Sequence, residues 1–220
     1  MNPKKIKKDC LIIYSGGMDS TVLLHEWKDR IALAITFNYG SKHNAEEYAR
    51  AELNCRELKI KHYKINLGNI FKHFKSDLLL SGGDIPEGHY EDESMKRTVV
   101  PFRNGIMLSI ATGIAESYGL KGVLIANHSG DHAIYPDCRK SFALSMSTAM
   151  MNGTESKIEL YGPYTNITKR EIALIGNRLG IKFELTYSCY KGGTIHCGVC
   201  GTCTERKEAL TGFDLTTYLQ

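Results

Sequence analysis

Two short apolar runs near the N-terminus, each followed by polar residues, set the pattern of the chain. They cover residues 10–14 and 31–37, and such runs are typical of parallel strands that are covered on both faces. Helix-like segments follow them over 21–27 and 44–58. This alternation, at intervals of about 25 to 30 residues, predicts a doubly wound, Rossmann-like α/β fold with a parallel sheet.

The rest of the chain continues the pattern more weakly. Further strands are predicted over 63–67 and 122–126, and helices over 106–115, 140–151 and 168–178. Thr168 and Glu171 fit a capping box that opens the last of these helices. The apolar residues of the helix over 140–151 are interpreted as core-filling, namely Phe142, Leu144, Met146, Met150 and Met151.

Residues 68–97 do not follow the pattern. They are rich in turn-forming residues, become acidic over 91–93 and show no strong period. A loop of this length is usually a mobile lid or a disordered excursion. The sequence therefore predicts one of these two states for the segment.

The loop over residues 15–20, Ser-Gly-Gly-Met-Asp-Ser, joins the first strand to the first helix. Its two glycines let the backbone approach a ligand closely, and the first amides of the helix favour an anion. Asp19 would repel a phosphate unless a cation lay between them, which indicates a role linked to Mg²⁺. The lysine of a P-loop and the spacing of a dinucleotide fingerprint are both missing.

Other candidate residues lie where a doubly wound sheet binds ligands, beyond the carboxyl ends of its strands. Tyr39 and His43 follow the second strand and are expected to reach the same pocket as the glycine loop. Arg103 stands beside Asn104 in a first helical turn, where its charge opposes the helix dipole. This placement indicates either a ligand anion or an ordinary surface arginine. The polar stretch after the fourth strand suggests substrate recognition, and its candidates are Asp131, Tyr135, Asp137 and Arg139.

Four cysteines near the C-terminus have the spacing of a metal site: Cys189, Cys197, Cys200 and Cys203. Four thiolates with no open position describe a structural Zn²⁺ site. An iron–sulfur cluster also uses four cysteines, but the spacing favours zinc, and a ligand role for the neighbouring His196 is less favoured. The remaining thiols are predicted to be buried, and they are Cys10, Cys55 and Cys138.

Composition adds limits on the class of protein. The chain has 220 residues, a net charge of +4 and seven cysteines, which suits one domain over 1–185 with a zinc-binding segment over 186–220. No apolar run is long enough to span a bilayer or to form a signal peptide, so a cytoplasmic protein that binds no membrane is expected. The first lysines are read as a solvated tail and not as a surface for nucleic acid.

The motif S-G-G-x-D-S resembles the pyrophosphate loop of the ATP pyrophosphatase superfamily, whose fold is adenine nucleotide alpha hydrolase-like. Members cleave ATP between the α and β phosphates and adenylate a substrate oxygen. With F-x-Y-G-x-x-H, P-x-R-N, Y-P-D-C-R and the four cysteines, the chain resembles the 7-cyano-7-deazaguanine synthase family. The resemblance implies conversion of 7-carboxy-7-deazaguanine and ammonia to the nitrile, through an activated carboxylate and an amide, in the queuosine pathway.

The resemblance also implies ATP, Mg²⁺ and Zn²⁺ as cofactors, a homodimer and roles for residues. Catalytic roles fall on Asp19, Ser20 and Arg103. The ATP-binding segment maps to Tyr14, Ser15, Gly16, Gly17, Met18, Asp19, Ser20, Thr21, Val22, Leu23 and Leu24. Substrate contacts are assigned to Tyr39, His43, Arg103, Asn104, Asp131, Tyr135, Asp137 and Arg139. The zinc ligands map to Cys189, Cys197, Cys200 and Cys203.

Some residues depart from the family pattern. Phe102 stands where the family usually has glycine, and Ser41 and Lys42 replace glutamine and arginine. Two alternatives stay open. A tRNA-thiolating enzyme of the same superfamily would need a pair of cysteines near the nucleotide, where Cys138 stands alone. A zinc ribbon that binds nucleic acid would use basic residues such as Lys191, but it would leave the glycine loop unexplained.

Overall fold

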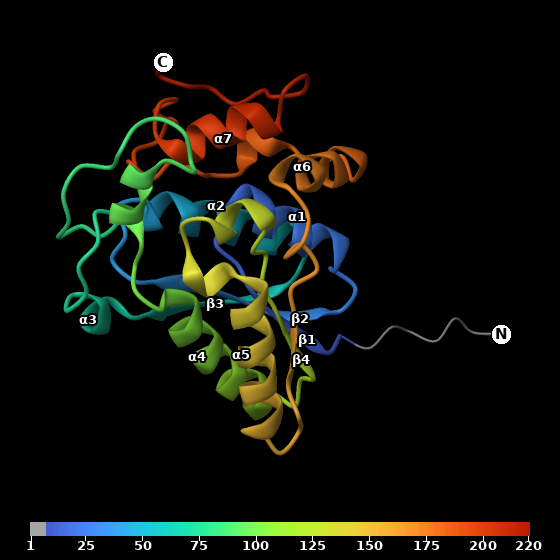
Figure 1. Cartoon of the computed structure of the whole chain (residues 1–220). Helices are drawn as coiled ribbons and strands as arrows, with labels where there is room; N and C mark the ends of the chain where they lie inside the picture. Colours follow the sequence, from blue (N-terminus) through green and yellow to red (C-terminus); the bar gives the residue numbers. More distant parts are fainter. Residues whose placement is uncertain (1–7) are drawn as a thin grey trace.

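Five parallel strands form the sheet at the centre of the computed structural model, which describes residues 8–220 (Figure 1). The strands are β1 (Cys10–Ile13), β2 (Ile31–Asn38), β3 (Lys61–Asn66), β4 (Gly122–Leu124) and β5 (Glu159–Tyr161). Their order in the sheet is β3-β2-β1-β4-β5, so the chain reverses its direction of winding between β1 and β4. The predicted doubly wound α/β sheet is confirmed.

Helices cover both faces of this sheet. They are α1 (Met18–Glu26), α2 (Asn44–Glu57), α3 (Gly68–Phe71), α4 (Arg103–Ser117), α5 (Lys140–Asn152), α6 (Lys169–Arg178) and α7 (Gly201–Ala209). Figure 1 shows α1, α2, α6 and α7 on one side of the sheet and α4 and α5 on the other. Among the described residues, no helix is both long and apolar enough to cross a membrane.

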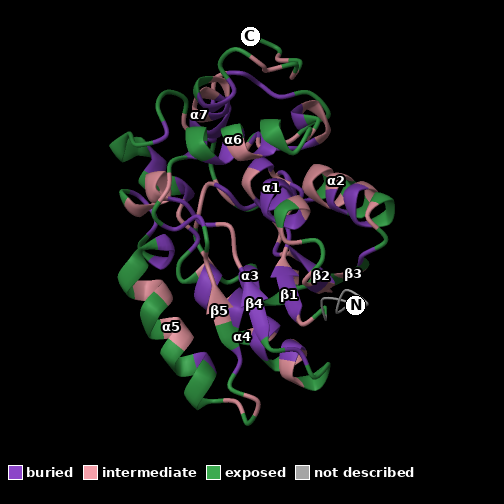
Figure 2. Ribbon diagram, turned by 90° about the vertical axis from the view of Figure 1, so that its right-hand side faces the viewer, coloured by how far each residue is buried: buried purple, intermediate pink, exposed green. Residues whose placement is uncertain are grey.

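The alternation of side chains along β1 divides the core into two parts (Figure 2). Leu11 packs in the same cluster as Leu108 of α4, while Ile12 packs with Val22 of α1 and Ala51 of α2. Successive residues of a strand point to opposite faces, so a strand covered on both faces must be apolar throughout. This requirement explains the continuous apolar run that predicted the strand.

The prediction of a mobile or disordered segment over 68–97 is wrong in this structure. The segment folds back on the body of the molecule and includes α3 and a short 3₁₀ helix, η1 (Glu93–Thr98). The Lys42 ammonium donates hydrogen bonds to the carbonyls of Leu79 (3.0 Å) and Gly83 (2.7 Å) and so fixes a turn of the segment. Apolar residues of the segment are buried, and they are Leu78, Leu79, Ile85, Tyr90 and Met95.

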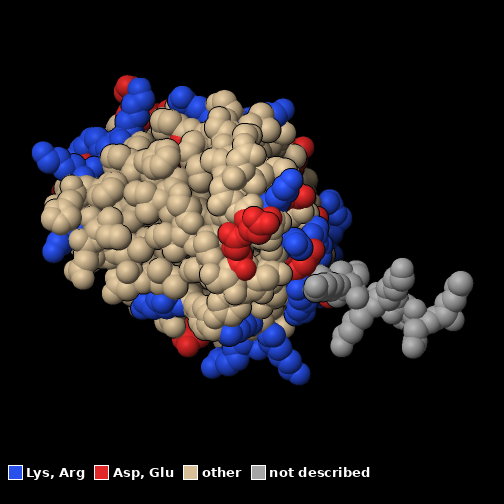
Figure 3. Space-filling model, turned by 90° about the horizontal axis from the view of Figure 1, so that it is seen from below, with Lys and Arg blue, Asp and Glu red and all other residues tan. Residues whose placement is uncertain are grey.

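The core-filling interpretation of α5 is wrong for Leu144 and Met151, while Phe142 and Met146 pack against the core. Met150 is buried, but Leu144 and Met151 are 61% and 39% exposed, and α5 lies at the outside of the molecule (Figure 2). Phe142 contacts the exposed ring of Phe102 edge to face, with centroids 5.7 Å apart. Figure 3, viewed from below, shows a broad area without charged residues, bordered by lysines and arginines.

The start of α6 follows the predicted capping box. The Thr168 hydroxyl accepts a hydrogen bond from the Glu171 amide (3.2 Å), and the Glu171 carboxylate accepts one from the Thr168 amide (2.7 Å). This cap satisfies amides that a helix start leaves unpaired. It therefore fixes the position of Lys169, the first residue of the helix.

Arg206 of α7 attaches the C-terminal segment to the linker that precedes the cysteines. Its fully buried guanidinium donates hydrogen bonds to the hydroxyls of Thr186 (2.9 Å), Ser188 (3.0 Å) and Thr216 (2.9 Å). The four cysteines themselves lie in the same core cluster as Leu33 of the sheet. The predicted boundary between a domain over 1–185 and a zinc-binding segment over 186–220 stays a prediction. The predicted basic tail, with Lys4, Lys5 and Lys7, lies outside the described residues.

Replacing Arg206→Met should lower the free energy of unfolding by about 3 kcal/mol or more, because several buried acceptors lose their donor together. Urea denaturation followed by circular dichroism measures the change. Arg178→Met, at an exposed position of α6, is the matched control and should change little. Equal losses in the two variants would contradict this account of Arg206.

Candidate active site and metal centre

A cavity of about 210 Å³ opens at the carboxyl ends of β1, β2 and β4, as the doubly wound topology requires. Segments far apart in sequence line it, from the glycine loop to the C-terminal cysteine segment. The candidate residues that line it are Tyr14, Ser15, Gly17, Met18, Asp19, Ser20, Tyr39, His43, Arg103, Asn104, Asp131 and Tyr135.

The other candidates outside the cysteine cluster do not line the cavity. Some of them hold the segments that line it, and the others lie away from it. Gly16 has φ +85°, and a Cβ there would lie 2.4 Å from the Glu47 carbonyl oxygen of α2, so no other residue fits. The Asp137 carboxylate accepts a hydrogen bond from the Asn104 amide (2.8 Å) and so holds the start of α4. Arg139 is exposed and donates to the His132 carbonyl (3.0 Å). The remaining candidates are buried in the first turns of α1: Thr21, Val22, Leu23 and Leu24.

The glycine loop presents hydroxyls and free helix amides to the cavity. The Gly17 amide donates to the Ser15 hydroxyl (3.1 Å), and the Ser20 hydroxyl donates to the Gly17 carbonyl (3.2 Å). No side chain caps α1 at Gly17. Its first-turn amides therefore stay available to an anion, which also gains from the positive end of the helix dipole.

A group of buried charges lies beside this loop, and sequence reasoning found it only in part. The Lys169 ammonium lies 3.3 Å from the Asp19 carboxylate and 2.8 Å from the Glu205 carboxylate of α7. Burial alone would lower the pKa of Lys169, but these two carboxylates outweigh it and raise that pKa. The capping box pointed to the place of Lys169, whereas no local pattern marked Glu205.

His128 completes this charged group. Its Nδ1 accepts a hydrogen bond from the Gly130 amide (3.1 Å), so the ring proton resides on Nε2. Nε2 lies 3.5 to 3.9 Å from carboxylate oxygens of Asp131, Glu205 and Asp19. The ring thus directs its Nε2–H toward three acids at the floor of the cavity.

The opposite side of the cavity is aromatic. The Arg103 guanidinium donates to the Tyr39 hydroxyl (3.2 Å), and the rings of His43 and Tyr190 stack with centroids 5.2 Å apart. The Tyr90 hydroxyl donates to the Asp131 carboxylate (3.0 Å) and so joins the two sides. Tyr90 and Tyr190 were missed because one lies in the segment thought to be mobile and the other beside a cysteine.

Burial changes the protonation of two residues between these sides. Burial lowers the pKa of His43 to about 3, and the same cause raises the pKa of the Glu47 carboxyl to about 8. Their side chains approach within 3.5 Å. Since His43 stays neutral near pH 7, this contact is a polar contact and not an ion pair.

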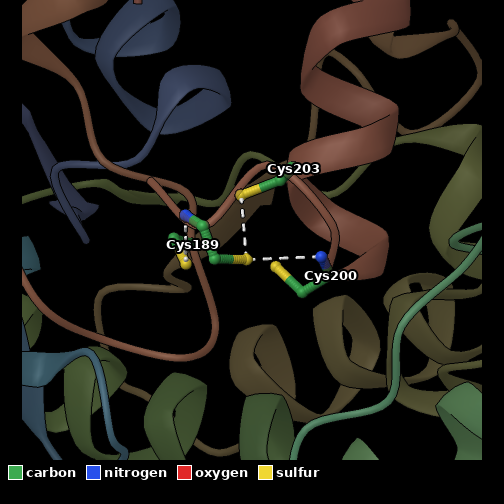
Figure 4. Close-up of side chains that lie close together, drawn as sticks. Cys189, Cys200 and Cys203 are labelled. Carbon is green, nitrogen blue, oxygen red and sulfur yellow. Dashed lines mark hydrogen bonds between the residues drawn. The ribbon is translucent and has the colours of Figure 1, made fainter. Parts of the chain in front are cut away.

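The four C-terminal cysteines form a compact, buried cluster (Figure 4). All four sulfurs lie within 4.8 Å of one another, and those of Cys197 and Cys203 are 3.9 Å apart. Four sulfurs around one tetrahedral metal at about 2.3 Å would lie about 3.8 Å apart, which fits. The His196 Nε2 accepts a hydrogen bond from the Ser188 amide (3.1 Å) and lies outside this group. The donor set is therefore that of a closed metal site.

The three other cysteines are buried, as predicted, and each has a free thiol. Burial raises the pKa of Cys10 and Cys55 to about 12 and that of Cys138 well above its ordinary value. Cys138 lines the cavity, and no second cysteine is among the described residues that line it. A thiol that stays protonated is a poor nucleophile.

Glu47→Gln should stabilise the protein increasingly as the pH rises. The folded state holds the Glu47 proton up to about pH 8, above the ordinary pKa, so its contribution is lost as the pH rises through that value. The amide cannot ionise. Melting temperatures at pH 5 and pH 9 should therefore show a growing advantage of the variant over the unaltered chain, and a constant difference would contradict the raised pKa.

Comparison with known proteins places this site in a family. A family model described as queuosine biosynthesis protein QueC matches residues 9–214. A protein of Porphyromonas gingivalis named 7-cyano-7-deazaguanine synthase is 60% identical over 93% of this chain and 93% of its own. One of the same name from Desulfotalea psychrophila is 50% identical over 96% and 99%.

Among solved structures, NMN synthetase of Francisella tularensis is similar with a TM-score of 0.50. The likeness covers 95% of this chain and 79% of that one at 15% identity, so it bears on the fold alone. The family match and the close relatives both span nearly the whole chain and include the glycine loop, the cavity and the cysteines. The chain therefore belongs to the QueC family of queuosine biosynthesis proteins.

Proposed function

We propose that this enzyme converts 7-carboxy-7-deazaguanine and ammonia to 7-cyano-7-deazaguanine at the expense of ATP. The names of its close relatives support this assignment. The observation that carries it is that one cavity joins the glycine loop, whose helix amides suit an anion, to an aromatic chamber containing a half-buried arginine. An enzyme that activates a carboxylate with ATP needs these two parts within reach of each other.

The glycine loop is the site we assign to the phosphates of ATP. The amides of α1 and the hydroxyls of Ser15 and Ser20 would contact phosphate oxygens. One oxygen of Asp19 is buried without a hydrogen-bond partner among the described residues, as expected of a group that receives a cation. Mg²⁺ there would neutralise charge that develops on the phosphates.

The aromatic chamber is the site we assign to the deazaguanine. A flat heterocycle would pack between the rings of Tyr135 and Tyr190, both of which line the cavity. Arg103 is half-buried there, and no carboxylate lies within ion-pair distance of it in the described part of the chain. A partly shielded cation without an acidic partner favours an anionic ligand, here the carboxylate of the substrate. Arg139 and Asp137 do not line the cavity, so they would affect substrate binding only through the backbone groups that they hold.

The chemistry follows from these positions. Transfer of the AMP group to a carboxylate oxygen turns a poor electrophile into an acyl phosphate, and pyrophosphate leaves. Ammonia then adds to the carbonyl carbon to form the C–N bond, the nitrogen gives up one proton, and the C–O bond breaks as AMP leaves with the electron pair, which gives the amide. A second activation, now of the amide oxygen, would allow loss of that oxygen and two N–H protons to give the nitrile. The chain holds both partners in one enclosed site, which reduces the entropic part of the barrier.

The cysteine cluster is proposed to hold Zn²⁺ in a structural role, because no position around it is open to substrate. Cys200→Ser should reduce the zinc content, measured by elemental mass spectrometry, well below the unaltered level of one per chain. Cys55→Ser, at a buried cysteine outside the cluster, should keep it. Iron with a visible absorption band in the purified protein would instead favour the iron–sulfur alternative.

The homodimer and the cytoplasmic location stay predictions.

The direct test is mass spectrometry of the enzyme incubated with ATP, Mg²⁺, ammonium and 7-carboxy-7-deazaguanine. A product at the nitrile mass is expected. Asp19→Asn should abolish turnover without unfolding the chain, because the amide carries no charge for the cation. The amide alone would indicate an enzyme that stops after one activation. With neither product, the substrate assignment fails, and tRNA becomes the next candidate.

A further inference from the structure

We propose that Glu205 is a positioning residue of the nucleotide site, which fixes the Lys169 ammonium beside the glycine loop. The inference rests on the proposed function in one respect, namely that residues 15–20 bind the phosphates of ATP. It assigns a part of that site to the cysteine-rich segment, whose proposed metal would otherwise be purely structural.

Three side chains from three separate segments carry the argument. Asp19 comes from the first turn of α1, Lys169 from the first turn of α6 and Glu205 from the middle of α7. The ammonium lies 2.8 Å from Glu205 and 3.3 Å from Asp19, and the three side chains are 9 to 20% exposed. An ion pair shielded from water in this way is stronger and more rigid than a surface pair.

The position of Glu205 depends on the cysteine cluster. Helix α7 begins directly after Cys200 and carries Cys203 in its first turn, as Figure 4 shows. One turn further along the same face of the helix, Arg206 is held by hydroxyls of the preceding linker. These anchors fix both the start and the rotation of α7, and Glu205 thereby faces Lys169.

Loss of this carboxylate would leave Lys169 with one acidic partner. The ammonium would then move toward Asp19 and neutralise the oxygen that we assign to the cation. A lysine displaced in this way would also no longer contact the phosphates. Both effects weaken the binding of ATP with Mg²⁺, and neither requires a change in the fold.

The test is titration of Glu205→Gln with a non-hydrolysable ATP analogue and Mg²⁺, together with the KM for ATP. We expect the dissociation constant to rise about tenfold, with kcat at saturating ATP changed less than KM. Glu208→Gln, three residues further along α7, alters a 62% exposed side chain and should bind as the unaltered chain does. Unchanged or tighter binding by Glu205→Gln would overturn the proposal.

A double-mutant cycle separates positioning from a packing role. In a Lys169→Met background, Glu205→Gln should weaken binding little further, because its effect passes through the lysine. An equal further loss would overturn the proposal. Glu205→Asp keeps the charge on a shorter side chain and should bind more tightly than Glu205→Gln, whereas a packing role predicts the reverse. Zinc content and melting temperature verify that each variant is folded.

Failure of the proposed function and failure of this inference give different results. Analogue binding needs no deazaguanine, so an error in the substrate assignment would leave the cycle interpretable. An additive cycle with normal nitrile formation would overturn the role of Glu205 alone. An unaltered chain that binds no nucleotide would overturn both.

Discussion

The contact between the Gly16 backbone and α2 is the constraint on which the site depends. With α2 backbone atoms 2.4 and 2.8 Å from the place of a Cβ, the loop can take its shape with glycine alone. The Gly16 carbonyl also accepts a hydrogen bond from the Tyr187 amide (3.1 Å), which leads into the cysteine segment. One peptide unit thus joins the first strand, the second helix and the last part of the chain.

The features that the sequence predicted depend on short-range patterns. Continuous apolar runs gave the strands because both faces of the sheet are covered, and the spacing of Cys197, Cys200 and Cys203 gave the metal cluster because its ligands are neighbours. The residues that were missed depend on packing between distant segments. Tyr90 and Tyr190 reach the cavity, and Glu205 of α7 reaches Lys169, only because segments far apart in sequence dock together, so no local rule could place them.

The two corrected segments differ from their predictions for separate physical reasons. Residues 68–97 are held by the carbonyl bonds of Lys42 and by scattered buried side chains, neither of which produces a regular pattern. Helix α5 has the apolar content of a core helix, yet it lies at the edge of the structure. Phe102, a departure visible in the sequence, proves to have φ 54°, where a side chain costs about 1 to 2 kcal/mol and glycine costs little.

The distribution of the cavity residues has a consequence for how the enzyme is made. Chains are synthesised from the N-terminus, and their early parts begin to fold during synthesis. The cavity combines Tyr14, which directly follows the first strand, with Thr202 from the last helix. The proposed nucleotide site is therefore incomplete until nearly the whole chain has left the ribosome. During that time the sheet must fold without help from a ligand in this cavity, and the proposed ligand, ATP, could not select the correct fold before the last helix docks.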